Sequence, residues 1–158
     1  MENVRAKRGN RDLTFKTYIM LNQKIKTYKG GRYETKDLFI LSKGMNSGKP
    51  LEKPCPNCFI CHCDSIQEKQ RIYWLLYALW QGKKFHESLV GSVIPFIRKK
   101  DLIKLLEVGL KSTLEQPCQI EEIFKKLQTV KQQELNYIKI QSSLAQLKCV
   151  LANQIINN

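Results

Sequence analysis

The chain has 158 residues, with 27 Lys and Arg against 14 Asp and Glu, and its formal net charge is +13. A hydrophobic content of 42% is enough to form a core and excludes wholesale disorder, and the length suits one domain with or without a helical appendage. The sequence contains no apolar run of about 18 residues, and the N-terminus MENVRAKRGNRD leads into none, so we expect neither a transmembrane helix nor a secretory signal. A cytoplasmic protein is therefore predicted, in which the six cysteines are thiols or metal ligands rather than disulfides.

The positive charge is concentrated in the first two thirds of the chain. Residues 1–64 hold 13 basic and 6 acidic side chains, residues 65–111 hold 9 and 4, and residues 112–158 hold 5 and 4. A concentrated positive field attracts polyanions, of which nucleic acid is the commonest. The alternative is a protein kept in solution by self-repulsion, but an isoelectric point near 9.6 favours nucleic acid.

The N-terminal part is predicted to be a basic arm followed by strands. Residues 1–11 form a flexible basic arm without periodicity. From Asp12 the pattern becomes strand-like: Leu13, Phe15 and Thr17 alternate with polar neighbours, and Ile25, Thr27 and Arg32–Leu41 continue this pattern, with the turn signal Gly30-Gly31 between two such runs. Residues 42–64 contain several Gly and Pro and are predicted to be a long loop without regular structure.

A helix is predicted from residue 66, because Ser65 and Glu68 form a capping box, and Gly82 is its stop signal. Its aromatic side chains are expected to pack in the core rather than to stack on bases. Residues 92–98 are predicted to be a buried strand, residues 99–106 a basic helix, and residues 108–110 an extended segment. The fold class is therefore α+β, with a globular domain over residues 12–111.

The third segment, residues 112–158, is predicted to form a long helix. Apolar residues recur every seven positions from residue 123 to residue 151, and no Gly or Pro follows Pro117. A helix of about 35 residues spans about 50 Å, so its apolar face needs a partner helix, unless it folds back on its own domain. We expect this face to pair two copies of the chain through Ile123, Leu127, Val130, Tyr137, Leu144, Leu147 and Leu151.

Four cysteines lie close together in the sequence C-P-N-C-F-I-C-H-C, at positions Cys55, Cys58, Cys61 and Cys63. Thiolates in a Cys-x-x-Cys turn can bind Zn²⁺, and we predict such a site here. Three readings stay open: four cysteine ligands, Cys55 and Cys58 with one of Cys61, His62 or Cys63, or four plain thiols. Redox chemistry is less favoured, because no strand-to-helix redox motif surrounds the pair. Cys118 and Cys149 are expected to be small packing residues.

No catalytic motif is evident, and we expect the protein not to be an enzyme. The sequence Gly44–Lys49 differs from a phosphate-binding loop in its spacing and in the proline after the lysine. His86 is interpreted as a surface or loop-anchoring residue, and a nucleophilic cysteine paired with it is a minor alternative.

The order of elements over about residues 65–156 resembles the target-recognition half of a type I restriction–modification DNA specificity subunit. The matching segments are Ile72–Trp80, Gly91-Ser92 with Val93–Ile97, Lys99–Leu106, Val108–Leu110, and Leu114-Glu115-Gln116 at the start of the long helix. Residues 42–59 also resemble an uncharacterised family carried on mobile elements of gut bacteria, which implies no function.

The resemblance implies DNA recognition without catalysis, with the long helix setting the spacing of two domains and docking methyltransferase subunits. We expect the 42–64 loop to read bases through Lys43, Asn46, Ser47 and Lys49, while Lys83, Lys84 and Arg98 bind phosphates. The alternative function is a protein–protein adaptor or inhibitor that docks on restriction–modification subunits through the long helix without reading DNA.

Overall fold

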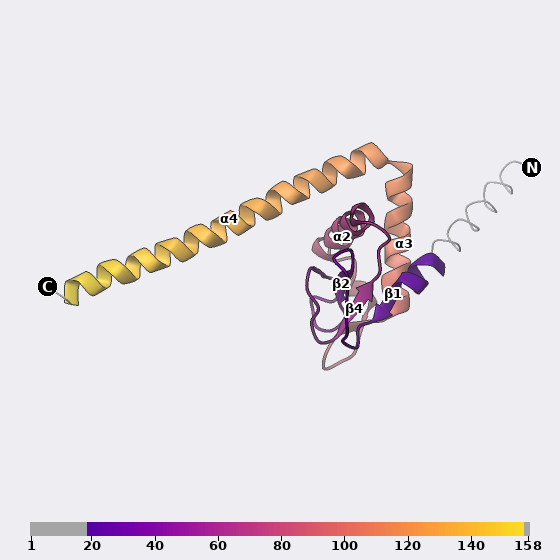
Figure 1. Ribbon diagram of the computed structural model, residues 1–158, viewed down its shortest axis with the longest axis horizontal. Helices are drawn as coiled ribbons and strands as arrows, with labels where there is room; N and C mark the ends of the chain where they lie inside the picture. Colours follow the sequence, from indigo (N-terminus) through magenta and orange to yellow (C-terminus); the bar gives the residue numbers. More distant parts are fainter. Residues whose placement is uncertain (1–18, 157–158) are drawn as a thin grey trace, which may run out of the picture. The chain divides into compact units, whose positions relative to one another are not determined.

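The computed structural model describes residues 19–156 and has the expected α+β arrangement of a small sheet domain and a long last helix (Figure 1). Residues 19–24 are helical and lead directly into the first strand. The elements that follow are β1 (Ile25–Thr27), β2 (Leu38–Leu41), β3 (Pro50–Leu51), β4 (Cys58–Cys61), α2 (Ile66–Gln81), the short 3₁₀ helix η1 (His86–Ser88), β5 (Leu89–Val90), β6 (Phe96–Ile97), α3 (Lys99–Glu115) and α4 (Pro117–Ile156). The chain divides into two compact units, Met1–Pro117 and Cys118–Asn158.

Two N-terminal predictions lie wholly or partly outside the described residues. The basic arm over residues 1–11 and the strand-like run over residues 12–18 are in this part of the chain. Residues 19–24, between the strand-like runs expected at Leu13–Thr17 and Ile25–Thr27, are helical.

The four-stranded sheet has the order β1-β4-β2-β3, and all of its pairs are antiparallel. Strand β4 lies between β1 and β2, where Cys61 pairs with Ile25 on one side and with Leu38 on the other. The prediction of an irregular loop over residues 42–64 is therefore wrong, because β3 and the central strand β4 lie within it. The run Cys-Phe-Ile-Cys is buried on both faces, so it lacks the alternation that marks a half-exposed strand.

Helix α2 begins and ends where the sequence predicts. The Ser65 side chain accepts a hydrogen bond from the Glu68 amide, and Gly82 is the C-terminal cap. The residue with left-handed backbone geometry at this helix end is not Gly82 but the next residue, Lys83, with φ of 55°. The Lys84 amide donates to the Leu79 carbonyl at 2.9 Å, which is the hydrogen bond of a Schellman motif.

The region after α2 differs from its prediction in two places. Strand β6 contains only Phe96 and Ile97, while Val93 and Ile94 are 90% and 60% exposed at the tip of the β5–β6 hairpin rather than buried. Helix α3 continues to Glu115, so residues 108–110 are helical rather than extended. A Cβ on Gly109 would lie 2.6 Å from Leu75 Cδ1, so this glycine permits close packing of α3 on α2 rather than breaking the helix.

Helix α4 has 40 residues and begins at Pro117, a residue well suited to the first helical position. The resemblance implies that the Glu115-Gln116 pair begins the long helix, and this expectation is wrong. Glu115 is the last residue of α3, and Gln116 is the C-terminal cap of α3, with φ of −136° and ψ of 61°. Within residues 19–156, no helix is both long enough and apolar enough to cross a membrane.

Candidate functional site

The predicted DNA-contacting residues come from three segments, which the structure brings together. The segment after β2 lies against β6: the Gly44 amide donates to the Pro95 carbonyl at 2.7 Å, and the Ile97 amide donates to the Ser42 carbonyl at 3.0 Å. Lys43 forms an isolated bridge with Phe96. Lys43 and Arg98, 55 positions apart in the sequence, are therefore on adjacent segments.

The same turn contacts the C-terminal end of α2. The Lys49 ammonium lies 4.8 Å from the centroid of the Trp80 ring, a cation–π contact. Gly48 faces the buried Phe85 ring so closely that a Cβ would lie 2.2 Å from its Cδ2 atom. Lys83 and Lys84 are exposed and lie in the short chain segment between Trp80 and Phe85, the two residues that this turn contacts.

Besides Lys49, which contacts Trp80, two more of the seven predicted residues are engaged within the protein. Ser47 is fully buried and its hydroxyl donates to the Gly44 carbonyl at 2.7 Å, so it stabilises the turn and does not face a ligand. Arg98 Nε lies 2.6 Å from Asp101 Oδ2, which neutralises part of its charge. We use the name basic surface for all the predicted residues except the buried Ser47: Lys43, Asn46, Lys49, Lys83, Lys84 and Arg98.

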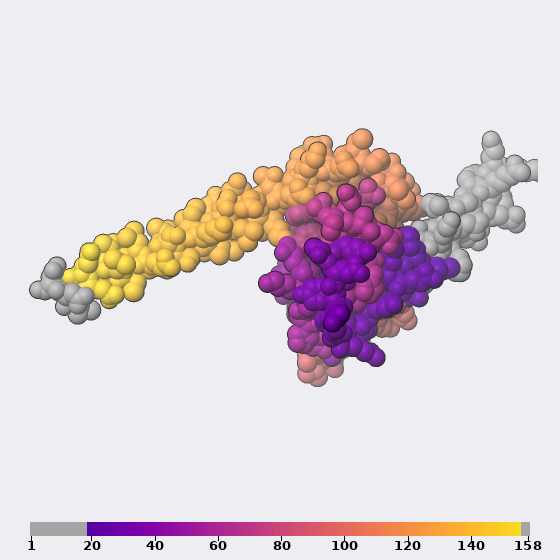
Figure 2. All heavy atoms as spheres, in the orientation of Figure 1, coloured from indigo at the N-terminus to yellow at the C-terminus, as the bar shows by residue number. Residues whose placement is uncertain are grey.

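The predicted pairing residues lie along α4 and have exposed side chains. Helix α4 is drawn in orange to yellow in Figure 2. Of its predicted pairing residues, Ile123, Val130, Tyr137, Leu144, Leu147 and Leu151 are between 42% and 69% exposed, and Leu127 is half-buried. Cys118 and Cys149 are exposed on the same helix, so the expectation that they are packing residues is wrong for the single chain. The exposed apolar residues form a seam that a second helix can cover.

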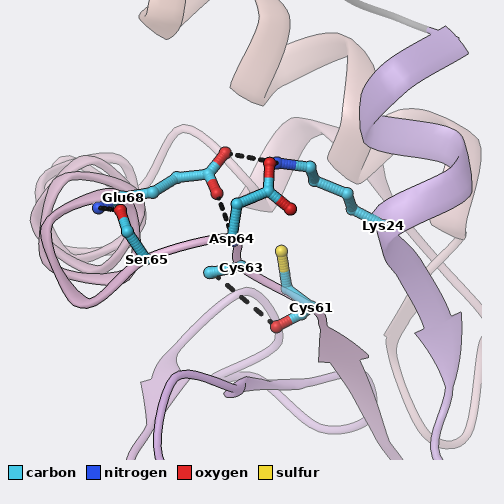
Figure 3. Close-up of polar contacts among 6 residues, drawn as sticks. All are labelled: Lys24, Cys61, Cys63, Asp64, Ser65 and Glu68. Carbon is cyan, nitrogen blue, oxygen red and sulfur yellow. Dashed lines mark hydrogen bonds and ion pairs between the residues drawn. The ribbon is translucent and has the colours of Figure 1, made fainter.

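The four clustered cysteines are divided between the two faces of the sheet. Side chains alternate along a strand, so Cys58 and Cys61 in β4 point to opposite faces. Cys58 packs with Phe39 and Ile60, and Cys55 lies against this same cluster. Cys61 is buried on the other face, where the Cys63 thiol lies 3.8 Å from the Cys61 carbonyl oxygen (Figure 3).

This division does not favour a single metal site made from all four cysteines. In the described part of the chain, no three His, Cys, Asp or Glu side chains gather in a way that could hold a metal ion. Burial raises the pKa of the Cys55 thiol, and the neighbouring Cys58 adds to this effect. The hydrogen bond with Cys63, together with burial, raises the pKa of Cys61. Both thiols are therefore more reluctant than an ordinary cysteine to become the thiolate that a metal binds.

His62 has a partner that the sequence did not reveal. Its Nδ1 lies 2.9 Å from Oδ1 of Asp37, a buried carboxylate whose other oxygen accepts the Glu34 amide at 2.8 Å. This contact orients the half-exposed imidazole, for which the sequence predicts only a possible role as a metal ligand. The two residues are 25 positions apart, so only the pairing of β4 with β2 shows their proximity.

Lys24 joins the end of the N-terminal helical segment to the start of α2. Its ammonium lies 2.7 Å from Asp64 and 2.6 Å from Glu68, and Glu68 also accepts the Asp64 amide at 2.6 Å (Figure 3). The Glu68 carboxylate thus caps the helix one residue earlier than the usual capping box, which uses the amide of the capping residue itself. Lys24 is 40 positions from Asp64 and 44 from Glu68, so the sequence alone does not predict this ion-pair cluster.

Comparison with known proteins places the chain in a family. The model of a family of unknown function, DUF6943, matches residues 25–154, which is most of the chain, so the protein belongs to this family. No curated protein and no solved structure matches it. The resemblance to type I specificity subunits stays a prediction.

Proposed function

We propose that this protein is a non-enzymatic, cytoplasmic DNA-binding protein that contacts the duplex through the basic surface and pairs with a second copy through α4. The observation that carries the proposal is that the three segments bearing Lys43, Lys49, Lys83, Lys84 and Arg98 contact one another. Basic side chains gathered on one surface match the closely spaced phosphates of a duplex.

The chemistry of the basic surface suits backbone contacts more than extensive base reading. Lysine and arginine bind phosphate oxygens without sequence information, and Asn46 is the one member that can bridge an adenine in the major groove. Its position in the exposed turn between Gly44 and Gly48 supports this role. A single short reading element per chain gives weak specificity, so recognition gains from two copies acting together.

The exposed seam on α4 supports pairing. From residue 137 to residue 151, apolar residues recur at alternating intervals of three and four: Tyr137, Ile140, Leu144, Leu147 and Leu151. This spacing is typical of the contact face of a coiled coil. Two paired chains double the number of phosphate contacts on one duplex, and binding through linked sites is tighter than binding through either one.

Duplex binding measured by fluorescence anisotropy across a series of salt concentrations tests the proposal. Each phosphate neutralised contributes about −0.9 to the slope of log K against log salt. We expect K83A/K84A to weaken binding and to reduce the steepness of that slope by about 1.8 per chain. The matched variant K125A/K139A removes the same charge from exposed positions on α4 and is expected to change the slope much less. Affinity that does not change with salt would contradict the proposal.

The exposed seam on α4 also favours a second candidate, an adaptor that docks on restriction–modification subunits through this helix and does not bind DNA. A methyltransferase subunit co-purifying with a chain that shows no duplex affinity would support this adaptor. A metal bound to the cysteines is a separate proposal, which metal analysis of the purified chain tests: no stoichiometric metal would reject it.

A further inference from the structure

Cys55 and Cys58 lie at the two ends of a tight turn. Pro56 occupies the second position of this turn, and Asn57 occupies the third with φ of 63°. Proline followed by a residue with positive φ is the signature of a type II β-turn. Such a turn holds its first and fourth Cα atoms within about 7 Å, and a disulfide spans about 4.4–6.8 Å. The turn therefore brings the two cysteines to the separation that a disulfide requires.

Hydrogen bonds to the neighbouring strands hold this turn in place. The Ser42 amide and hydroxyl both donate to the Asn57 carbonyl, at 2.9 and 2.5 Å. On the other side, the Tyr28 amide donates to the Cys58 carbonyl at 3.0 Å. Both cysteines belong to the cluster around Phe39, on one face of the sheet. The two thiols are thus held close together before any reaction takes place.

The two thiols differ in their access to solvent. Cys58 is fully buried, whereas Cys55 is partly exposed and lines an open groove of about 490 Å³ together with Tyr28, Lys29, Gly30, Pro54 and Pro56. The charged side chain lining this groove is Lys29, which favours an anionic ligand. By contrast, Cys61 and Cys63 on the other face are both buried.

We propose that Cys55 and Cys58 form a thiol–disulfide exchange site for a small anionic disulfide, in which Cys55 attacks and Cys58 resolves. Because burial raises the pKa of the Cys55 thiol, we expect the reaction in alkaline buffer, where Cys55 ionises. The Cys55 thiolate attacks one sulfur of the disulfide RSSR, so that Cys55 becomes bonded to SR and one RSH leaves after taking up a proton. Cys58 then loses its proton and attacks the Cys55 sulfur, releasing the second RSH. Two protein thiols are oxidised to one disulfide, and RSSR is reduced to two thiols. The proposal does not depend on DNA binding.

Oxidised glutathione is the probe, because it is a small disulfide with a net negative charge. The reduced full-length chain is incubated with it, the remaining thiols are alkylated, and disulfides are located by peptide mapping. We expect a Cys55–Cys58 link in the folded protein, with Cys61 and Cys63 recovered as free thiols. The exposed Cys118 and Cys149 show that the reagent is active. Recovery of Cys55 and Cys58 as free thiols, in a chain glutathionylated at Cys118 and Cys149, would overturn the proposal.

Single-cysteine variants separate the two roles. C58S is expected to accumulate glutathione on Cys55, because the resolving thiol is missing. C55S is expected to leave Cys58 unmodified, because Cys58 is buried behind the turn. Equal glutathionylation of Cys58 in C55S and of Cys55 in C58S, in chains with the circular dichroism spectrum of the wild type, would contradict the assignment.

The charge preference is tested without altering either cysteine. Oxidised glutathione is compared with the neutral hydroxyethyl disulfide and the cationic cystamine, and the rate of loss of the Cys55 thiol is measured. We expect K29E to slow the reaction with oxidised glutathione relative to the neutral disulfide by roughly twofold to fivefold. K104E makes the same charge change at an exposed position on α3 and is expected to preserve the wild-type order. Equal rate changes in K29E and K104E would show that Lys29 in the groove does not select an anionic disulfide.

Discussion

At the scale of single residues, Gly44 and Gly48 make a matched pair at the base of the basic surface. Both have φ of 92°, a conformation that costs any L-residue about 1 kcal/mol. Nothing lies within 4 Å of a Cβ placed on Gly44, whereas a Cβ on Gly48 would overlap the buried Phe85 ring. The same substitution therefore separates the cost of backbone strain from the cost of side-chain overlap.

We predict that G44A lowers the free energy of unfolding by about 1 kcal/mol and that G48A lowers it by about 3 kcal/mol or more. Urea unfolding followed by circular dichroism measures both values. Equal losses in the two variants would show that the contact between Gly48 and Phe85 does not limit this turn.

Lys24 gives the molecule a dependence on alkaline pH. Burial of the ammonium lowers its pKa, but the hydrogen bonds to Asp64 and Glu68 outweigh this effect and raise the pKa of Lys24 above its usual value of 10.5. Because the folded pKa is higher than the unfolded one, the stabilisation is fully present below about pH 10.5 and is lost as the pH rises through the folded pKa.

We predict that K24M lowers the free energy of unfolding by about 2 kcal/mol at neutral pH, and that its difference from the wild type shrinks above about pH 10.5. Urea unfolding at a series of pH values measures the difference. The control K36M removes the more exposed lysine beside Glu34 and is expected to change stability very little. If the difference in unfolding free energy between K24M and the wild type instead grows with pH, the ion pairs do not raise the pKa of Lys24.

At the scale of secondary-structure elements, Gly109 sets how closely α3 approaches α2. Alanine at a helix interior position normally adds about 1 kcal/mol of stability over glycine. Here the added Cβ would meet the side chain of Leu75, which is buried and cannot move freely. The packing term therefore outweighs the helix propensity.

We predict that G109A destabilises the wild-type chain by about 1–2 kcal/mol and stabilises an L75A chain, where the space is free. Thermal unfolding of the four chains in this double-mutant cycle gives the coupling. A stabilising effect of G109A in the wild-type background would show that α3 and α2 are not in close contact at this position.

Helices marked by a capping residue or by periodic apolar residues could be predicted from the sequence. Strands that form only by pairing with distant segments could not. The Ser65 cap and the seven-residue spacing after Pro117 lie within single segments, and α2 and α4 follow them. Strand β4 was missed because Cys-Phe-Ile-Cys sits between a proline-containing turn and a cap, and it has no alternation to mark it. Residues 108–110 were expected to be extended, but they lie within α3, where Gly109 packs against Leu75.

The candidate sites follow the same division. The charge distribution in the sequence predicted that the globular part is basic. The contacts between its segments, such as that of Lys49 with Trp80, join residues far apart in the chain and could not be predicted from their spacing. The four cysteines are adjacent in the sequence, which favoured one metal site. Once β4 is recognised as a strand, its alternation alone divides Cys58 from Cys61.

At the scale of the whole molecule, we propose that a DNA-binding unit is joined to a helix that pairs two copies. The two parts are tested separately by a charge placed on the α4 seam. L144E/L147E introduces two charges into the proposed contact, while S142E adds a charge on the opposite side of the same helix. We predict that the double variant is monomeric and binds duplex more weakly, and that S142E behaves as the wild type.

The most direct measurement is sedimentation velocity of the full-length chain mixed with a labelled duplex in low salt. We predict a salt-sensitive complex that contains two chains per duplex for the wild type, and a weaker complex with one chain per duplex for L144E/L147E. A duplex that sediments unchanged in the presence of excess protein would show that the chain does not bind DNA.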